Sequence, residues 1–161
     1  MSTAQPIRPR TVGKASFSFA IVASQYNATY VQGLVEQAHR EINELEPGAK
    51  IKIIWVPGAF EIPVMAKLAL GKKTFHAVIA LGVLLQGETS HALLVAQSVT
   101  AALQDIALEF SIPVINEVLL LQNEEQARAR CLEPELNRGT EAARAAVSIV
   151  RTAREITSKP A

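Results

Sequence analysis

The feature of this sequence that most constrains its fold is the alternation of short apolar runs with longer segments of helical periodicity. Four runs rich in β-forming residues predict strands at 17–23, 51–56, 75–85 and 113–121. Apolar residues spaced by three and four predict helices at about 31–45, 61–70, 89–110 and 137–157, and Asn123 with Gln126 has the spacing that caps a further short helix. The order is therefore βαβαβαβα.

This order predicts a parallel sheet with right-handed crossovers and helices on both faces. The unbroken apolar stretch 77–81 is typical of a central strand that is buried on both sides. Pro-Gly pairs at 47–48 and 57–58 interrupt the pattern, and Gly71 is expected to close the second helix. The predicted class is α/β, a three-layer αβα fold with a four-stranded parallel sheet, doubly wound in the flavodoxin-like manner.

A chain of 161 residues is the size of one domain. We expect a single domain at 15–161, preceded by an extended or mobile arm at 1–14 that contains Pro6, Pro9 and Gly13. The 16 basic and 15 acidic residues are dispersed, so no nucleic-acid partner is expected. The lone Cys131 excludes an internal disulfide and a thiolate metal cluster, and we interpret it as a small buried or half-buried residue.

The amino-terminal residues lack the apolar core of a secretory signal. The longest apolar run, 77–85, is far shorter than the roughly 20 residues that a membrane helix needs. We therefore expect a soluble protein of the cytoplasm with no membrane partner.

Candidate ligand-binding residues follow three of the predicted strands, at 24–27, 57–61 and 86–91. Ligands of open parallel sheets bind beyond the carboxyl ends of the strands, so these loops are expected to converge. Tyr26 and Phe60 would suit a slot for a flat heterocycle or ordinary core positions. Glu61 would suit pairing with ligand hydroxyls or a favourable place in the first turn of a helix.

The turn from Gly87 to Ser90 has the composition of an anion site, because a glycine and hydroxyls precede a helix whose first N–H groups are free. Plain helix capping by Thr89 or Ser90 explains the same residues. His91 lies in the first helical turn, where a neutral imidazole is favoured; it would serve as a base or as an exposed polar residue. Arg130 and Arg138 would be solvated, or would bind a phosphate.

Several common catalytic patterns are absent from the sequence. There is no metal-ligand spacing, no Ser/His/Asp series, no GxGxxG and no GxxxxGK[ST]. Metal-dependent hydrolysis, dinucleotide oxidoreduction and nucleotide hydrolysis therefore lose support, and neither a metal nor a cofactor is expected.

Taken together, the motifs closely resemble the lumazine synthase family over about residues 16–157. They are Tyr26-Asn27, PGAFEIP at 57–63, the stretch 82–91 with G-x-T-x-H at its end, and 124–127 through Arg130 to 137–139. The resemblance implies a cofactor-free transferase of riboflavin biosynthesis. Its reaction condenses 5-amino-6-ribitylaminouracil with 3,4-dihydroxy-2-butanone 4-phosphate to 6,7-dimethyl-8-ribityllumazine and releases phosphate and water.

The resemblance also implies roles for individual residues. His91 would transfer protons, and Glu141 would support the site as an acidic neighbour of Arg130 and His91. The residues implied to bind the ribitylaminouracil are Tyr26, Asn27, Ala59, Phe60, Glu61, Leu84, Leu85, Asn116 and Arg138. Those implied to bind the phosphate are Gly87, Glu88, Thr89 and Arg130.

This chain departs from the family pattern at several positions. Gln86 replaces a basic residue, Asn116-Glu117 replace an aromatic followed by glycine, Leu120-Leu121 replace two threonines, and Arg138 replaces lysine. Two alternatives are a non-catalytic flavin- or lumazine-binding paralogue and an archaeal-type riboflavin synthase. The retained Thr89, His91 and Arg130 argue against both.

A second apolar set in the predicted helix 89–110, namely Leu94, Ala101 and Leu108, lies off the main stripe and predicts a subunit interface. The resemblance makes the assembly a homopentamer, either free or as the unit of a sixty-subunit shell. It also implies an active site shared between neighbours. Tyr26, Glu61 and His91 would come from one subunit, and Asn116, Arg130 and Arg138 from the next.

Overall fold

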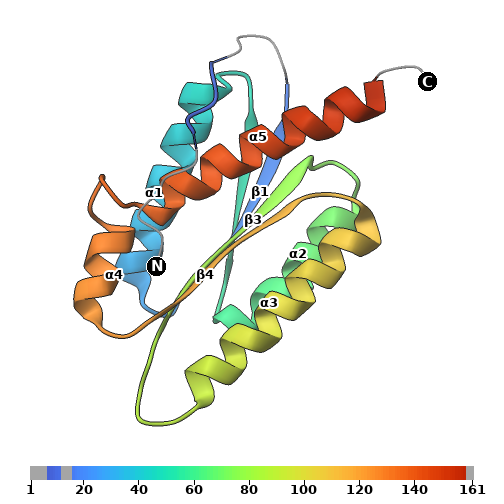
Figure 1. The fold of residues 1–161 in the computed structure, drawn as a ribbon. Coiled ribbons are helices and arrows are strands. Elements are labelled where there is room, and N and C mark those ends of the chain that lie inside the picture. The colour runs from blue at the N-terminus through green and yellow to red at the C-terminus, as the bar shows by residue number, and fades with distance from the viewer. Residues whose placement is uncertain (1–6, 12–15, 159–161) are drawn as a thin grey trace.

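The computed structural model describes residues 7–11 and 16–158, and within these ranges it contains one parallel sheet of four strands in the order β2-β1-β3-β4 (Figure 1). The strands are β1 (Ser18–Ser24), β2 (Lys50–Val56), β3 (Ala77–Leu85) and β4 (Val114–Leu121). The helices are α1 (Ala28–Leu45), α2 (Ile62–Gly71), α3 (His91–Phe110), α4 (Glu124–Cys131) and α5 (Arg138–Ser158), with a 3-10 turn at Ala59–Glu61 before α2. The predicted three-layer α/β class is confirmed.

The side chains of β1 show how the three layers are held together. Phe19 and Ile21 point into a core formed with α1, α4 and α5, whereas Ala20 and Val22 point into a second core formed with α2 and α3. Figure 1 shows these two groups of helices on opposite faces of the sheet. The stretch 77–81 of β3 is fully buried, as its unbroken apolar pattern predicts.

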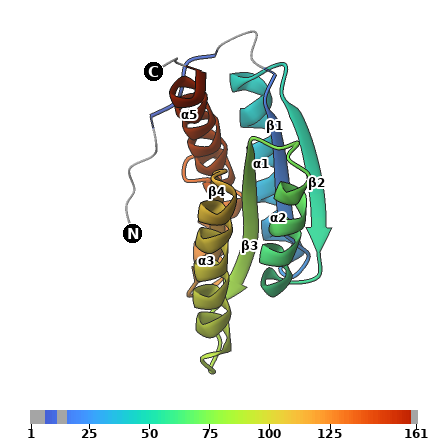
Figure 2. The same cartoon turned by 90° about the vertical axis from the view of Figure 1, so that its right-hand side faces the viewer.

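The strand register aligns the carboxyl ends of neighbouring strands. Ser24 at the end of β1 pairs with Val56 at the end of β2, and β3 extends past β1 to reach Leu85, which pairs with Leu121 of β4. The loops after β1, β2 and β3 therefore leave the same edge of the sheet, and Figure 2 shows the loop between β3 and α3 at that edge.

The ends of two helices differ in detail from the prediction. Gly71 is the last residue of α2 and does not take a positive φ; Lys73 does so instead, with φ 53°, and its N–H donates to Leu70 O at 2.9 Å. The helix thus ends at Gly71 as predicted, and the residue with positive φ that completes the turn is Lys73. α3 begins at His91 rather than Thr89.

The predicted cap of α4 is confirmed. Asn123 Oδ1 accepts from the N–H of Gln126 at 2.9 Å, and Gln126 Oε1 accepts from the N–H of Gln122 at 3.0 Å. Both bonds satisfy N–H groups near the start of the helix.

Part of the predicted arm lies against the domain. Arg8 donates to Glu41 at 2.9 Å and to Glu44 at 2.8 Å, both on α1, and Arg151 of α5 donates to the carbonyl of Arg10 at 2.7 Å. The remaining residues of the predicted arm, 1–6 and 12–14, lie outside the described ranges.

α3 is apolar on two sides. Val99, Leu103 and Ile106 are buried, whereas Leu94 and Leu108 are 61% and 68% exposed. By length and composition α3 would be able to cross a bilayer, with mean hydropathy 1.3 over its most apolar window, and no other helix in the described ranges meets that test. A single helix of this kind is weak evidence for a membrane span, because helices of soluble proteins pass the same criterion.

Candidate active site

The loops that follow β1, β2 and β3 converge at the carboxyl edge of the sheet. Asn27 takes the left-handed conformation, φ 56° and ψ 44°, and its Nδ2 donates to Val83 O at 2.8 Å. The N–H of Gln25 donates to Val56 O at 2.9 Å. The loop after β1 is therefore bonded to both neighbouring strands, which holds Tyr26 between them.

The two aromatic side chains of this edge are exposed, Tyr26 by 72% and Phe60 by 62%. The alternative that they fill the core is therefore wrong. A Cβ at Gly58 would lie 3.3 Å from the Tyr26 ring and 3.0 Å from Glu61 Oε2, so only glycine leaves both side chains undisturbed. Glu61 Oε2 accepts from the N–H of Gly58 at 2.9 Å, which fixes the carboxylate beside the ring.

The other apolar candidates near these loops are less exposed than the two aromatic side chains. Ala59 is buried, and Leu84 and Leu85 at the end of β3 are half-buried. The hydroxyl of Ser24 is buried and has no hydrogen-bond partner among the described residues. The sequence pattern placed Ser24 in the candidate loop 24–27 without a role of its own, and its unsatisfied hydroxyl becomes visible only from the packing.

The loop from Gln86 to Ser90 is pinned by an amide side chain. Gln86 Nε2 donates to Gly87 O at 3.1 Å and to Thr89 O at 3.2 Å. Ser90 makes no side-chain cap, and Thr89 Oγ1 lies 3.5 Å from the N–H of His91. Plain helix capping thus depends on one long contact, and the first turn of α3 keeps N–H groups without an intrahelical partner. Glu88 and His91 are exposed at this point.

Arg130 lies on the other side of the sheet from this loop. It belongs to the last turn of α4, which packs on the α1 and α5 face, whereas His91 begins α3 on the opposite face (Figure 1). Arg130 is half-buried and makes no hydrogen bond or ion pair within residues 7–11 and 16–158. One chain therefore does not bring Arg130 and His91 together.

Arg138, at the start of α5, lies between two carboxylates. Its Nε and Nη2 donate to Glu117 of β4 at 3.0 and 3.2 Å, and its Nη1 donates to Glu141 at 2.5 Å. The partner of Glu141 in this chain is thus Arg138. Gly139 seats this turn of α5 on α1, because a Cβ there would lie 2.1 Å from Leu34 O.

Burial raises the pKa of Glu117, and the charge and hydrogen bonds of Arg138 offset only part of this effect. Burial, with the nearby charge of Glu117, also raises the pKa of Cys131 to about 12. Cys131 is fully buried, which confirms its interpretation as a structural residue and leaves little thiolate for chemistry.

Asn116 is exposed on β4, on the face that carries α3. Its Nδ2 donates to Thr100 Oγ1 at 3.1 Å, and its Oδ1 accepts from the N–H of Val118 at 3.0 Å. The predicted site residues thus fall into two groups in one chain. One group lies around the ends of β1 to β3, and the other lies on β4, α4 and the start of α5.

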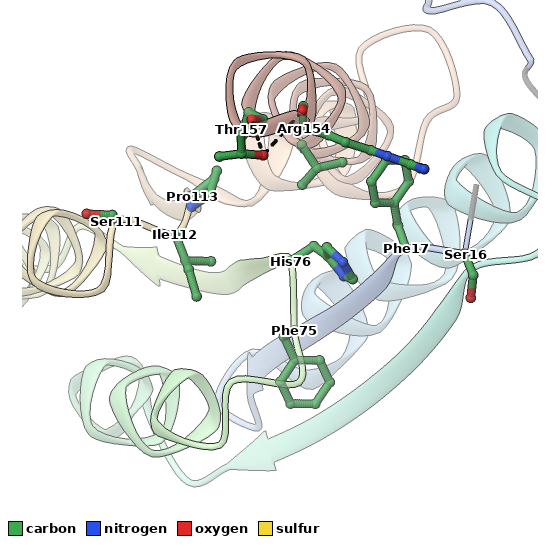
Figure 3. Close-up of a pocket in the computed structure, with 11 residues that line it drawn as sticks. Ser16, Phe17, Phe75, His76, Ser111, Ile112, Pro113, Arg154 and Thr157 are labelled. Atoms are coloured by element: carbon green, nitrogen blue, oxygen red, sulfur yellow. Dashed lines mark hydrogen bonds between the residues drawn. The ribbon is translucent and has the colours of Figure 1, made fainter. Parts of the chain in front are cut away.

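A cavity of about 560 Å³ lies at the opposite, amino-terminal edge of the sheet and contains none of the predicted site residues (Figure 3). His76 lines this cavity and accepts from the N–H of Ser18 through Nδ1 at 3.0 Å, and its ring makes a T-shaped contact with the ring of Phe17. The guanidinium of Arg154 lies over the same Phe17 ring, 5.6 Å from the centroid. His76 and Arg154 are therefore engaged in local structure.

Comparisons with known proteins agree with these motifs. Residues 16–154 match the model of the family described as 6,7-dimethyl-8-ribityllumazine synthase. A protein of that name from Coxiella burnetii is 40% identical over 144 residues, which cover 89% of this chain and 95% of the relative. Relatives of the same name from Paraburkholderia phymatum and Streptomyces coelicolor are each 39% identical, covering 83% and 85% of this chain and 76% and 85% of their own lengths.

Proposed function

The chain belongs to the 6,7-dimethyl-8-ribityllumazine synthase family, and on this premise we propose that the two groups of site residues form one active site between neighbouring copies. The activity is the transferase reaction of riboflavin biosynthesis, in which 5-amino-6-ribitylaminouracil and 3,4-dihydroxy-2-butanone 4-phosphate condense to the lumazine. The relatives are named as synthases, and nothing favours the non-catalytic paralogue or the archaeal-type riboflavin synthase.

The uracil substrate is assigned to the edge formed by the loops after β1, β2 and β3. The observation that carries this assignment is the exposure of Tyr26 and Phe60 beside a carboxylate, Glu61, whose orientation is fixed by Gly58. Tyr26 stacks on the heterocycle, and Glu61 with Asn27 and Ala59 holds the ribityl chain. Leu84 and Leu85 line the apolar side of the ring.

The phosphate of the second substrate is assigned to the loop at the start of α3. Gly87 leaves open space, Thr89 offers a hydroxyl, and the first N–H groups of α3 carry about half a positive charge. Glu88 completes this loop. Arg130 of the neighbouring copy supplies the charged partner, and support for this comes from its lack of a partner within the described part of its own chain.

The reaction needs proton transfers and no protein nucleophile. The substrate amine attacks the carbonyl, an imine forms with loss of water, phosphate is eliminated, and the second nitrogen closes the ring with loss of another water. His91, exposed beside the phosphate loop, is placed to move these protons. The larger contribution is the holding of two reactive molecules side by side, an effect worth several kcal/mol.

We assign the assembly to a homopentamer, as a free ring or as the unit of a sixty-subunit shell. The exposed Leu94 and Leu108 on α3 support a contact there, because apolar side chains on a helix face are usually covered. A cytoplasmic location is proposed from the single buried cysteine.

The test of the function is an assay with both substrates that follows lumazine absorbance and released phosphate in the same sample. We expect one phosphate for each lumazine formed. In parallel samples supplied with lumazine or flavin, binding without turnover would instead identify the non-catalytic paralogue, and conversion of the added lumazine to riboflavin would identify the riboflavin synthase.

A further inference from the structure

Arg138 is held by three bonds to two carboxylates from different elements. Glu117 projects from β4 and engages Nε and Nη2, while Glu141 lies one turn along α5 and engages Nη1. The carboxylate side chains are only 11% and 8% exposed, whereas that of Arg138 is 29% exposed. The pairing therefore fixes the guanidinium plane and leaves part of it open to the outside.

A count of the hydrogen-bond donors of Arg138 shows how many remain available to a ligand. A guanidinium carries five N–H groups. Three are used by Glu117 and Glu141, and no other hydrogen bond of Arg138 forms within the described residues. One N–H on each terminal nitrogen remains available to a ligand.

The charges around Arg138 limit which kind of ligand its free N–H groups are able to bind. One guanidinium faces two carboxylates, so the cluster has no positive charge to attract an anion. Arg130 differs, because no carboxylate contacts it within the part of the chain that the structure describes. Arg138 is suited to a neutral carbonyl acceptor, and Arg130 is suited to a phosphate.

A contribution to the stability of the fold does not explain why position 117 carries a glutamate. Its neighbours on the same face of β4, Ile115 and Leu119, pack against the apolar core with α1 and α5. Burial raises the pKa of Glu117, so its ionisation at neutral pH costs folding free energy. Buried ion pairs are often no more stabilising than apolar residues of similar size. A charged residue at this point therefore calls for a role beyond packing.

We propose that Glu117 is a positioning residue of the synthase, which orients Arg138 and, together with Glu141, offsets its charge so that Arg138 binds a neutral pyrimidine carbonyl and rejects anions. This inference rests on the proposed function and on the contact of Arg138 with the ribitylaminouracil that the family resemblance implies. It assigns a role to Glu117, which stands where the family pattern has glycine, and links it to Arg138, which stands where the pattern has lysine.

The test is Glu117→Gln, which keeps the shape and removes the charge. We expect KM for the ribitylaminouracil to rise roughly tenfold, with little change in KM for the butanone phosphate, because one charge-assisted contact to Arg138 is lost. Inorganic phosphate should begin to compete with the uracil substrate, since the charge of Arg138 is then balanced by Glu141 alone and the second carboxylate no longer repels anions. In the parent protein phosphate should compete only with the butanone phosphate.

Glu41→Gln is the matched control. Glu41 is also a buried glutamate held by arginines, Arg8 and Arg144, but it lies on α1 away from the site residues. We expect both KM values to stay unchanged in this variant. In an Arg138→Met background, Glu117→Gln should have no further effect on KM, because Glu117 acts through the guanidinium.

Several results would overturn the inference. They are unchanged kinetics in Glu117→Gln, an equal change in both KM values, and the same change in Glu41→Gln. If Glu117→Gln does not fold, Glu117→Asp keeps the charge but shortens the reach, and it should raise the uracil KM without phosphate competition; unchanged kinetics there count equally against the inference. Absence of lumazine formation by the parent protein would contradict the proposed function itself, so the two failures are distinguishable.

Discussion

Asn27 donates from Nδ2 to the carbonyl oxygen of Val83 at 2.8 Å and thereby joins the loop after β1 to the end of β3. The bond is made from a left-handed backbone conformation, which places Tyr26 beside Gly58. Position 27 needs both a positive φ and a side-chain donor, and asparagine meets both needs because it tolerates a positive φ and carries an amide N–H.

Replacement of Asn27 separates these two requirements. Asn27→Gly keeps the positive φ and loses the bond, whereas Asn27→Ala loses the bond and adds backbone strain of about 1 kcal/mol. We expect the alanine variant to have the lower free energy of unfolding in urea, and both variants to have a higher KM for the ribitylaminouracil. Equal stability of the two variants would show that the backbone conformation is unimportant.

Arg130→Ala should weaken the phosphate-bearing substrate. The lost charge-assisted contact is worth about 1.5–3 kcal/mol, while the uracil pocket keeps all its residues. Steady-state kinetics should therefore show a large rise in KM for the butanone phosphate and little change for the uracil. An unchanged butanone phosphate KM would exclude Arg130 as the phosphate ligand.

His91→Ala should lower turnover by about 100-fold or less, because proton transfer is a smaller contribution than substrate proximity. The measurement is kcat under saturation with both substrates, with circular dichroism as the control for folding. Complete loss of activity in a folded protein would point to an essential covalent or electrostatic role instead.

Mixed oligomers test the shared site. If His91 and Arg130 come from adjacent copies, co-refolded His91→Ala and Arg130→Ala chains should regain activity at roughly a quarter of the interfaces, because random mixing restores both residues there. Native mass spectrometry confirms the mixing. Mixed assemblies that remain as inactive as the parents would show that the two residues do not serve one site across an interface.

The ion pairs of Glu41 predict a pH dependence of stability. Burial raises the pKa of Glu41, but the hydrogen bonds and charges of Arg144 and Arg8 outweigh burial and leave the pKa below its usual value of 4.5. A lowered pKa in the folded state stabilises the fold above about pH 4.5, and this contribution is lost as the pH falls through the folded-state pKa.

Glu41→Gln should therefore lower the free energy of unfolding at pH 7 by about 1–3 kcal/mol and have a smaller effect at acid pH. Urea unfolding of both proteins across this pH range is the measurement. A difference that stays constant with pH would mean that the carboxylate charge contributes nothing.

Local sequence pattern determined the elements of this protein and their order. The strands at β1 to β4 and the cap at Asn123 were predictable, because hydrophobic periodicity and capping involve residues within a few positions of each other. The end of α2 at Gly71 was predictable for the same reason, although the residue that takes a positive φ after the helix is Lys73.

The family resemblance already implied the two groups of site residues, but only the tertiary structure decided which side chains pair within a group. The pairing of Glu117 with Arg138, 21 positions apart, depends on which face of β4 Glu117 occupies and on how closely Gly139 lets α5 approach α1. His91 and Arg130 are separated because α3 and α4 cover opposite faces of the sheet. The contact of Glu117 with Arg138 and the separation of His91 from Arg130 both follow from the crossovers and the strand order. The hydrophobic periodicity of the sequence does not record either of them.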